Sequence, residues 1–386
     1  MRHVGGVARR GAAWFDGLLA EGVLEVSADP TDLDRGGWWA VVATFEGRLT
    51  AWRFERVRRA QLPARRPASA SVAPPADPVV GGGSSGDLRG HDNGWPGIGA
   101  GEWSSSLDRE AYLAGVGEIR RRIREGEVYQ VNLCRVMSAP VPAQVDPWAL
   151  ADRLARGNPA PYAGVIDVPD LPGAPGSSGA PGVPGVCVVS ASPELYLARQ
   201  GEVVRSGPIK GTAPTAAQLL PKDEAENVMI VDLVRNDLQR VCRPGTVEVT
   251  RLLELESHPG LVHLVSQVQG RLRPDAGWAQ LLAATMPPGS VSGAPKSSAL
   301  RAIADLETVP RGPYCGAVGW VDADRGRACL AVGIRTFWWD GGRLCFGTGA
   351  GITWGSDAEQ EWAETELKAH HLVGLTGDGR VEAARL

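Results

Sequence analysis

Apolar and polar residues alternate in short runs along this 386-residue chain, a pattern typical of a sheet-rich protein with helices between its strands. Apolar runs bounded by turn residues predict strands within residues 13–57 and at 129–140, 186–199, 246–253, 261–272, 315–323, 328–339 and 343–352. Helical spacing predicts helices at 108–128, 222–241, 277–285, 294–307 and 356–374. Because hairpin-like turns join the strands and the helices are interspersed irregularly, we predict an α+β fold with largely antiparallel sheets.

Low-complexity stretches divide the chain. Residues 1–60 form an N-terminal strand-rich segment, and residues 61–107 form a linker rich in Pro, Gly and Ser with few apolar side chains to bury. Residues 108–375 are predicted to form the main domain. A second low-complexity stretch, 170–185, separates two strand-like segments. It is interpreted as a surface loop, because added loop length costs little free energy.

The composition argues against several classes of partner. A net charge of -4 and a pI near 5.9 give no electrostatic reason to expect nucleic acid or an anionic membrane. The chain has no apolar run long enough to span a membrane and its N-terminal sequence lacks the apolar core of a signal peptide, so a cytoplasmic location is predicted. The six cysteines include no C-x-x-C pair and are predicted to be buried thiols: Cys134, Cys187, Cys242, Cys315, Cys329 and Cys345.

The basic residues are unevenly distributed. The chain has 36 arginines but only four lysines, all in its second half: Lys210, Lys222, Lys296 and Lys368. Arginine is a fixed cation, whereas lysine loses its proton when desolvated and then acts as a nucleophile or base. Lys210, in the stretch SGPIKGTAPT, is therefore a candidate catalytic residue. The alternative is that four surface lysines escaped a codon bias toward arginine.

Two predicted helices carry paired carboxylates. Asp223 and Glu226 are three residues apart near the start of one helix, and Glu361 and Glu364 are three apart on the last helix. Residues at this spacing share a helix face, so each pair presents its oxygens to one side. Mg²⁺ takes one or two carboxylates together with water and substrate oxygens, which makes these pairs candidate magnesium ligands. The alternative is an ordinary solvated helix face.

Other candidate residues lie near strand ends. The stretches GPIKGT, PPGSVSGAPK and FGTGAGI contain turn glycines whose backbone N–H groups suit carboxylate binding, although neither a dinucleotide fingerprint nor a P-loop is present. Glu194 ends one predicted strand, 16 residues before Lys210, and a hairpin of that length brings the two together. His263 lies inside an apolar strand, where a core histidine is the alternative. Arg335 is expected to alternate with apolar neighbours along a strand and to require a carboxylate partner.

In combination these segments resemble the chorismate-utilising enzymes, the family of anthranilate, aminodeoxychorismate, isochorismate and salicylate synthases. The resemblance covers residues 108–371 and rests, in order, on GEVYQVNL, SPELYL, GPIKGTAP, DEAENVMIVDLVRNDLQRV, ESHPGLVHLVS, PPGSVSGAPK, GAVGW, GIRTF, GTGAGI and EQEWAETELK. It implies a chorismate-binding fold in which two largely antiparallel sheets pack as a sandwich with helices outside.

The resemblance also implies roles for individual residues. Glu226 and Glu364 match the inner ligands of a Mg²⁺ ion that holds the ring carboxylate of chorismate, with Asp223 and Glu361 acting mainly through water. Lys210, Glu194 and His263 match catalytic positions. The positions that match substrate-binding residues are Gly211, Thr212, Ser290, Tyr314, Arg335, Gly349, Gly351 and Lys368.

Single residues distinguish the members of the family. The water-adding relatives have a lysine base where this chain has Gln130, and glutamine cannot serve as that base. Anthranilate synthases resemble PIAGT, whereas PIKGT, with Lys210, is the form of aminodeoxychorismate synthase component I. There the lysine adds at C2 and expels the C4 hydroxyl, a matching glutamate protonates the leaving group, and ammonia enters at C4. Asn227, where anthranilate synthases usually have histidine, favours the same assignment.

The resemblance also implies a partner. The sequence shows no glutaminase constellation, so a separate glutamine amidotransferase subunit is expected to supply ammonia, and the product would lead to p-aminobenzoate and folate. Two alternatives remain. One is a sibling enzyme that makes anthranilate or 2-amino-2-deoxyisochorismate, and the other is an inactive chorismate-binding subunit.

Overall fold

The computed structural model describes residues 9–67, 95–142, 145–170, 185–213, 215–219, 221–258 and 261–377. Most of the predicted loop 170–185, and residues 68–94 of the predicted linker, lie outside these ranges.

The strands are β1 (Arg9–Phe15), β2 (Leu18–Ser27), β3 (Trp38–Ala43), β4 (Leu49–Arg59), β5 (Ser104–Ser105), β6 (Gln130–Pro140), β7 (Tyr162–Val168), β8 (Val186–Ser192), β9 (Leu195–Gln200), β10 (Val203–Gly207), β11 (Ile209–Ala213), β12 (Glu248–His258), β13 (Leu261–Arg271), β14 (Gly293–Ala294), β15 (Ala317–Asp322), β16 (Arg327–Val332), β17 (Thr336–Asp340) and β18 (Arg343–Ile352). The α-helices are α1 (Arg109–Arg124), α2 (Pro147–Gly157), α3 (Pro221–Gln239), α4 (Trp278–Thr285), α5 (Lys296–Leu306) and α6 (Ala358–Gly374).

The strands form one continuous antiparallel sheet rather than the two separate sheets that were expected. Its first half runs β12, β13, then β10 and β11, then β9, β16, β15, β3 and β4. Its second half runs β2, β1, β7, β8, β17, β18 and β6, with the short strands β5 and β14 against β6. The pairing of β4 with β2 joins the halves. The N-terminal strands therefore complete the sheet, which explains why no break separates two layers.

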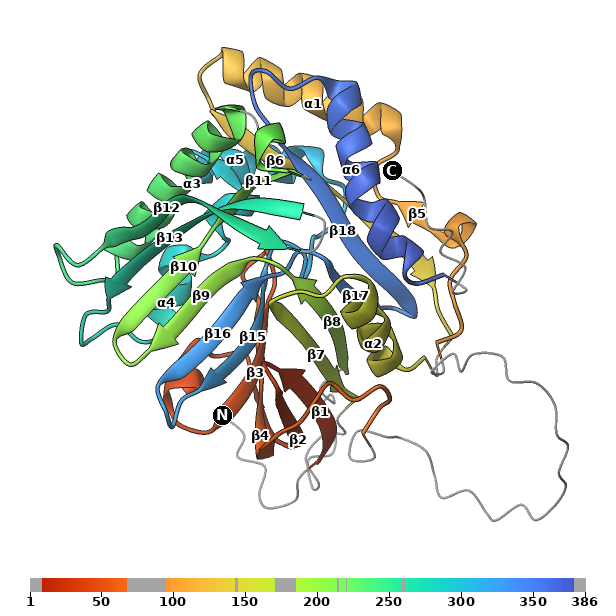
Figure 1. Ribbon diagram of the computed structural model, residues 1–386, viewed down its shortest axis with the longest axis vertical. Helices are drawn as coiled ribbons and strands as arrows, with labels where there is room; N and C mark the ends of the chain where they lie inside the picture. The colour runs from red at the N-terminus through yellow and green to blue at the C-terminus, as the bar shows by residue number, and fades with distance from the viewer. Residues whose placement is uncertain are drawn as a thin grey trace, which may run out of the picture.

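The sheet buries both of its faces. On β1, Ala13 and Phe15 lie in the main core while Ala12 lies in a second apolar cluster, and on β7 the same division separates Ile166 from Val165. This two-residue alternation is the ordinary consequence of strand geometry. Figure 1 shows α2 beside β7 and β8, α1, α3 and α5 along the upper edge of the fold, and α6 running from that edge toward α2. The second cluster is centred on α2, a helix that the sequence analysis did not anticipate.

One predicted strand is interrupted at the point where the chain crosses between the two halves. Residues 186–199 form β8 and β9, separated by Pro193 and Glu194. Proline cannot donate to a strand ladder, which favours a break here. The Glu194 N–H donates to Ser192 Oγ at 3.3 Å, and the Glu194 carbonyl accepts from Val332 N–H at 3.0 Å. The break therefore fixes Glu194 between the halves.

A second strand is interrupted beside the first. Residues 328–339, expected as one strand, form β16 and β17, and Arg335 lies between them with a φ of 51°. This left-handed backbone is uncommon for a residue other than glycine. The Arg335 carbonyl accepts from Ala191 N–H at 3.0 Å. The expectation that Arg335 alternates along a strand was wrong, because its backbone is held outside the ladder.

Two further sequence predictions can be compared with the structure. All six cysteines are free; four are buried, and Cys187 and Cys329 are partly exposed. Within the described residues, none of the helices has the length and apolar character needed to cross a membrane.

The β1–β7 pairing offers a test of the sheet's closure. Gly164 pairs with Phe15, and a Cβ added at Gly164 would lie 2.0 Å from the Phe15 ring. Gly164→Ala is expected to destabilise the protein by about 1–3 kcal/mol, since overpacking forces neighbouring groups to shift. Gly117→Ala is the control: this glycine is exposed on α1, a Cβ there meets nothing, and the change should stabilise by up to about 1 kcal/mol. Urea unfolding measures the free energy of unfolding of each variant relative to wild type. A Gly164→Ala variant as stable as wild type would contradict the close contact with Phe15.

Candidate active site

Glu194 is the most deeply buried of the predicted catalytic carboxyls. Its side chain is 4% exposed, in the crossing between β8 and β9. Burial raises its pKa to about 7, although hydrogen bonds from the Ser290 side chain and the Ile209 backbone, and the charge of Lys210, act in the opposite direction. A carboxyl with this pKa is partly protonated near neutral pH, so Glu194 is able both to give and to take a proton.

Lys210 lies near enough to Glu194 and to the two acidic helices for its charge to act on their carboxyl groups. It is half-buried on β11, and its positive charge lowers the pKa of Glu194, of Glu226 on α3 and of Glu364 on α6. The next residue, Gly211, has a φ of 78°, and a Cβ there would lie 2.9 Å from Asp223 Cβ. Lys210, Glu194 and acidic side chains of both helices therefore lie within range of one another's charge.

The two pairs of carboxylates face a common region. Burial raises the pKa of Glu226; Lys210 and Lys222 oppose this effect, and Asp223 and Glu364 add to it. These influences show that side chains of α3 and α6 lie close enough to interact.

The acidic side chains of α6 have distinct partners. Burial raises the pKa of Glu361, and the Ser356 hydroxyl, which donates to its carboxylate at 2.6 Å, opposes that effect. Burial also raises the pKa of Glu364, but Lys368, whose Nζ is 2.5 Å from Glu364 Oε1, brings it below its ordinary value with help from Lys222 and Lys210. Lysine ammonium groups therefore balance part of the charge of this cluster.

The donor set fits a magnesium ion held partly by substrate and water. Within the described ranges, three or more His, Cys, Asp or Glu side chains do not converge as a preformed metal site. Two carboxylates from different helices, Glu226 and Glu364, nevertheless supply the hard oxygen ligands that Mg²⁺ takes, and this ion commonly keeps waters and binds substrate oxygens. Its binding to this chain remains a prediction.

Three predicted substrate-binding residues lie on β18 or against it: Gly349, Tyr314 and Lys368. A Cβ at Gly349 would lie 2.6 Å from Cys134 Sγ, and the Gly349 carbonyl accepts from Lys368 Nζ at 3.2 Å. Tyr314 is 5% exposed and its ring covers Gly347, where a Cβ would lie 2.0 Å from the ring. The Tyr314 hydroxyl is 3.9 Å from Cys134 Sγ. Small residues on β18 thus allow side chains from neighbouring elements to approach its backbone closely.

Arg335 has the properties of a ligand-binding guanidinium. It is half-buried, and burial lowers its pKa. Among the described residues its side chain has no ion pair, in contrast with Arg311, which is fully buried and pairs with Glu307. A buried guanidinium needs an anionic partner, which a carboxylate of a bound substrate would provide.

His263 and Thr212 are neighbours across the β11–β13 ladder. The His263 side chain is 3% exposed, while the Thr212 side chain lies outside what the structure describes. Ser290 lies in a 3₁₀ turn, Gly289–Val291, beside Glu194. The structure therefore places both strand positions near Lys210 in the ladder and Ser290 near the candidate acid.

Sequence reasoning missed the role of two side chains. Lys222 is one turn before Glu226 on α3 and interacts with Glu226, Glu361 and Glu364; its rarity as a lysine was the available signal. Asn227, interpreted as an indicator of product, is fully buried and holds α3 against β13. Its Nδ2 donates to the Leu264 carbonyl at 3.0 Å, and Ser266 Oγ donates to its Oδ1 at 2.5 Å. Asn227 therefore anchors α3 to β13 through hydrogen bonds.

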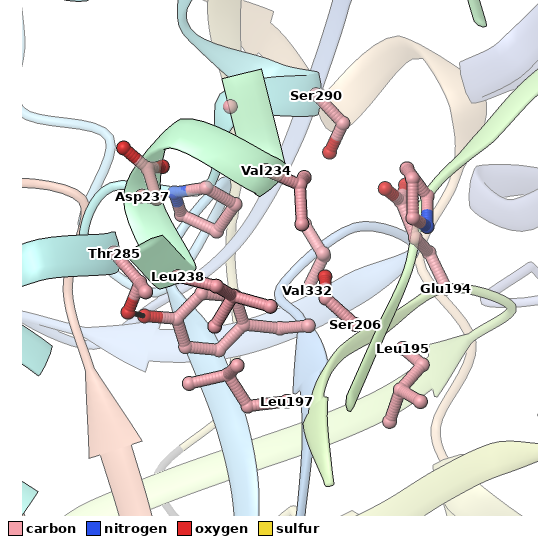
Figure 2. A pocket seen from close by; sticks show the side chains of 14 residues that line it. Glu194, Leu195, Leu197, Ser206, Val234, Asp237, Leu238, Thr285, Ser290 and Val332 are labelled. Carbon is pink, nitrogen blue, oxygen red and sulfur yellow. Dashed lines mark hydrogen bonds between the residues drawn. The ribbon is translucent and has the colours of Figure 1, made fainter. Parts of the chain in front are cut away.

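A small pocket lies beside Glu194 (Figure 2). Glu194 and Ser290 contribute to one side of it, and Asp237 and Thr285 to the other. Lys296 Nζ donates to Asp237 Oδ2 at 2.5 Å and to the Thr285 carbonyl at 3.3 Å, which ties the start of α5 to α3 and to the end of α4. Glu194 lines this pocket but Lys210 does not, so the pocket lies beside the Glu194 carboxyl and not at the Lys210 amine.

The raised pKa of Glu194 predicts a pH-dependent cost to stability. Because the folded-state pKa, about 7, exceeds the ordinary value of 4.5, this carboxyl lowers the free energy of unfolding as pH rises from about 4.5 to about 7. Glu194→Gln removes that loss. Its stability relative to the wild-type protein should therefore increase by on the order of 3 kcal/mol between pH 4 and pH 8, measured by urea unfolding. The exposed Glu110→Gln variant is the control, and parallel pH profiles for Glu194→Gln and wild type would contradict the burial argument.

Comparison with known proteins identifies the family. A family profile described as chorismate binding enzyme matches residues 96–374. Anthranilate synthase component 1 1 of Haloarcula marismortui is 36% identical over 288 residues, which cover 72% of this chain and 55% of that protein. Aminodeoxychorismate synthase component 1 of Klebsiella aerogenes is 36% identical over 285 residues, covering 70% of this chain and 59% of that protein. Across three similar anthranilate synthase component 1 chains, the match spans 55–64% of the relative's length.

Solved structures show the same fold. Anthranilate synthase component I of Streptococcus pneumoniae superposes with a TM-score of 0.67 at 23% identity, covering 95% of this chain and 91% of that one. The menaquinone-specific isochorismate synthase of Escherichia coli superposes with a TM-score of 0.68 at 18% identity, covering 97% and 90%. With the family profile covering most of its length, the chain belongs to the chorismate-binding enzymes.

Proposed function

We propose that this chain aminates chorismate at C4 to give 4-amino-4-deoxychorismate, through a covalent adduct on Lys210. The observation that carries the proposal is the position of the Lys210 amine between the protonatable Glu194 and the carboxylates of α3 and α6. A nucleophile beside an acid is what a displacement with a poor leaving group requires.

The first step uses Lys210 and Glu194. The unprotonated Lys210 amine forms a bond to C2, the ring double bond shifts, and the C4–O bond breaks. Glu194 gives its proton to the departing oxygen, which leaves as water, and Glu194 becomes a carboxylate. Arg335 binds a substrate carboxylate and, with Glu226 and Glu364, fixes the ring orientation. Bound Mg²⁺ would balance the charge of the ring carboxylate.

The second step reverses the displacement with a different nitrogen. Ammonia forms a bond to C4, the double bond shifts back, and the C2–N bond to Lys210 breaks to release the neutral amine. The new C4 ammonium group gives one proton to the Glu194 carboxylate, which restores the acid. Chorismate and ammonia are thereby converted to aminated product and water. We propose that a separate glutamine amidotransferase subunit supplies the ammonia and that the product serves p-aminobenzoate synthesis.

Anthranilate synthesis is the second candidate, because curated anthranilate synthase components are similar to this chain to the same degree, 36–38% identity. The residue at position 210 separates the two proposals. Anthranilate formation adds ammonia directly at C2, the carbon that the Lys210 amine would occupy. A lysine here, close to Glu194, therefore favours C4 amination.

Replacement of the lysine tests the covalent route. Lys210→Ala should lower formation of the C4 product by on the order of 10³-fold, because the nucleophile acts in the transition state. Lys210→Arg keeps the positive charge but should not restore activity, since guanidinium does not lose its proton. The assay uses purified protein, chorismate, Mg²⁺ and ammonium, with chromatographic separation of C4-aminated, C2-aminated and aromatic products. C4 product at the wild-type rate from Lys210→Ala would refute the adduct, and anthranilate from the wild-type protein would establish the second candidate.

Replacement of the acidic side chains tests the metal site. Glu226→Gln and Glu364→Gln each remove one negative charge from the proposed ligand set, so the Mg²⁺ concentration for half-maximal activity should rise by about 10-fold or more, as ligand-shell changes commonly produce. Glu254→Gln, on β12, is the exposed control. Titration calorimetry with Mg²⁺ in the presence of chorismate gives the same comparison as binding. An unchanged magnesium titration in both variants would exclude these two residues as ligands.

A further inference from the structure

Gln130 is a buried polar residue with an unsatisfied oxygen. It begins β6 and its side chain is 2% exposed. Its backbone is held on both sides, since β14 pairs with it through Ala294 and β18 continues along the other edge of β6. The Oε1 atom is buried and has no hydrogen-bond partner within the described part of the chain. A buried acceptor without a hydrogen-bond donor costs about 1–3 kcal/mol, so a donor is expected to reach this oxygen at some stage of function.

The position of Gly351 places the Gln130 amide beside Lys210. A Cβ added at Gly351 would lie 2.4 Å from Gln130 Nε2 and 3.9 Å from Lys210 Nζ. The two side chains therefore converge on the same point above the β18 backbone. Glycine at 351 leaves the space that both occupy, whereas any larger residue there would collide with the Gln130 amide.

A half-turn of the Gln130 amide turns its unsatisfied oxygen toward Lys210. The oxygen and nitrogen of a primary amide occupy equivalent positions on one planar group, so a half-turn about the last side-chain bond of Gln130 exchanges them. In that orientation Oε1 faces the Lys210 amine. A lysine amine has N–H groups to donate whether or not it carries its extra proton. Lys210 is thus a suitable donor both before and after deprotonation.

We propose that Gln130 is a positioning residue for the nucleophile: its Oε1 accepts an N–H of the Lys210 amine and so aims the nitrogen lone pair at the substrate ring. This inference rests on the proposed function. The amide takes no proton and forms no bond to substrate. Its effect is to restrict rotation of an otherwise freely rotating amine, which raises the fraction of molecules in a reactive geometry.

The variant that tests this role is Gln130→Met, which keeps an unbranched apolar stem of similar length and removes the strong acceptor. Gln130→Glu restores an acceptor oxygen at the same reach. Gln269→Leu, a partly exposed glutamine on β13 that bonds to Arg205 and Glu248, is the control for loss of a glutamine as such. Thermal unfolding of each variant reports on folding.

The readout is the covalent adduct itself. Protein mixed with chorismate and Mg²⁺ without ammonia is quenched over time, and intact-mass spectrometry follows the gain of one chorismate less one water. Gln130→Met should form this adduct about 10-fold more slowly, the effect of one hydrogen bond, with the KM for chorismate within about twofold of wild type. Gln130→Glu should recover part of the lost rate, and Gln269→Leu should match wild type.

Several results would overturn the inference. An adduct rate in Gln130→Met equal to wild type removes the positioning role, and so does a raised KM with an unchanged rate at saturation, which would make Gln130 a substrate contact. Gln130→Glu also adds a negative charge that favours protonated Lys210, so its adduct rate is compared at the pH optimum of each variant; a rate there as low as in Gln130→Met shows that the acceptor is not what matters. Wild-type protein that forms neither adduct nor C4 product overturns the proposed function, and the role of Gln130 with it.

Discussion

Two adjacent chain crossings between the halves of the sheet position the candidate chemistry. Between β8 and β9 the Glu194 carbonyl is bound by Val332 N–H, and between β16 and β17 the Arg335 carbonyl is bound by Ala191 N–H. Each crossing interrupts a strand, so its side chain is not confined to the alternation of a ladder. The crossings therefore present a carboxyl and a guanidinium from backbone that is held by hydrogen bonds at both ends. Rigid support of this kind is what a site with fixed geometry needs.

The charge balance of the site follows from this framework. Four carboxylates on α3 and α6 meet three of the chain's four lysines, Lys210, Lys222 and Lys368. Burying like charges together is costly unless cations offset them. In the described structure, lysines offset the negative charge of these carboxylates. A bound divalent cation and an anionic substrate would change this charge balance. The depressed pKa of Glu364 and the raised pKa of Glu226 show that the balance is uneven between the two helices.

Much of the fold was predictable because local patterning determines it. The helices at α1, α3, α4, α5 and α6 match apolar periodicity, and the acidic pairs on α3 and α6 share faces as their spacing requires. The continuity of the sheet was not predictable, since it depends on long-range pairing of β1 with β7 and β3 with β15. Nor was the strand break at Arg335, because its cause is a tertiary hydrogen bond to Ala191; the break at Glu194 had a local signal in Pro193, which the strand-like pattern on either side obscured. Resemblance suggested the candidate site residues, and the structure shows which of them lie near one another.

The scarcity of lysine acquires a physical meaning at this site. Arginine binds a carboxylate through two parallel N–H groups and keeps its proton, so an arginine at 210 would remain locked to Glu194 or Glu226. Lysine makes a single-point contact that is readily exchanged and becomes a nucleophile once deprotonated. In the proposed role Gln130 would complement this property, because an amide that accepts from the amine adds no charge and so does not favour the protonated form. A chain that elsewhere uses arginine thus has, at 210, a residue whose cation can be discharged, beside a neutral acceptor and a carboxyl with a raised pKa.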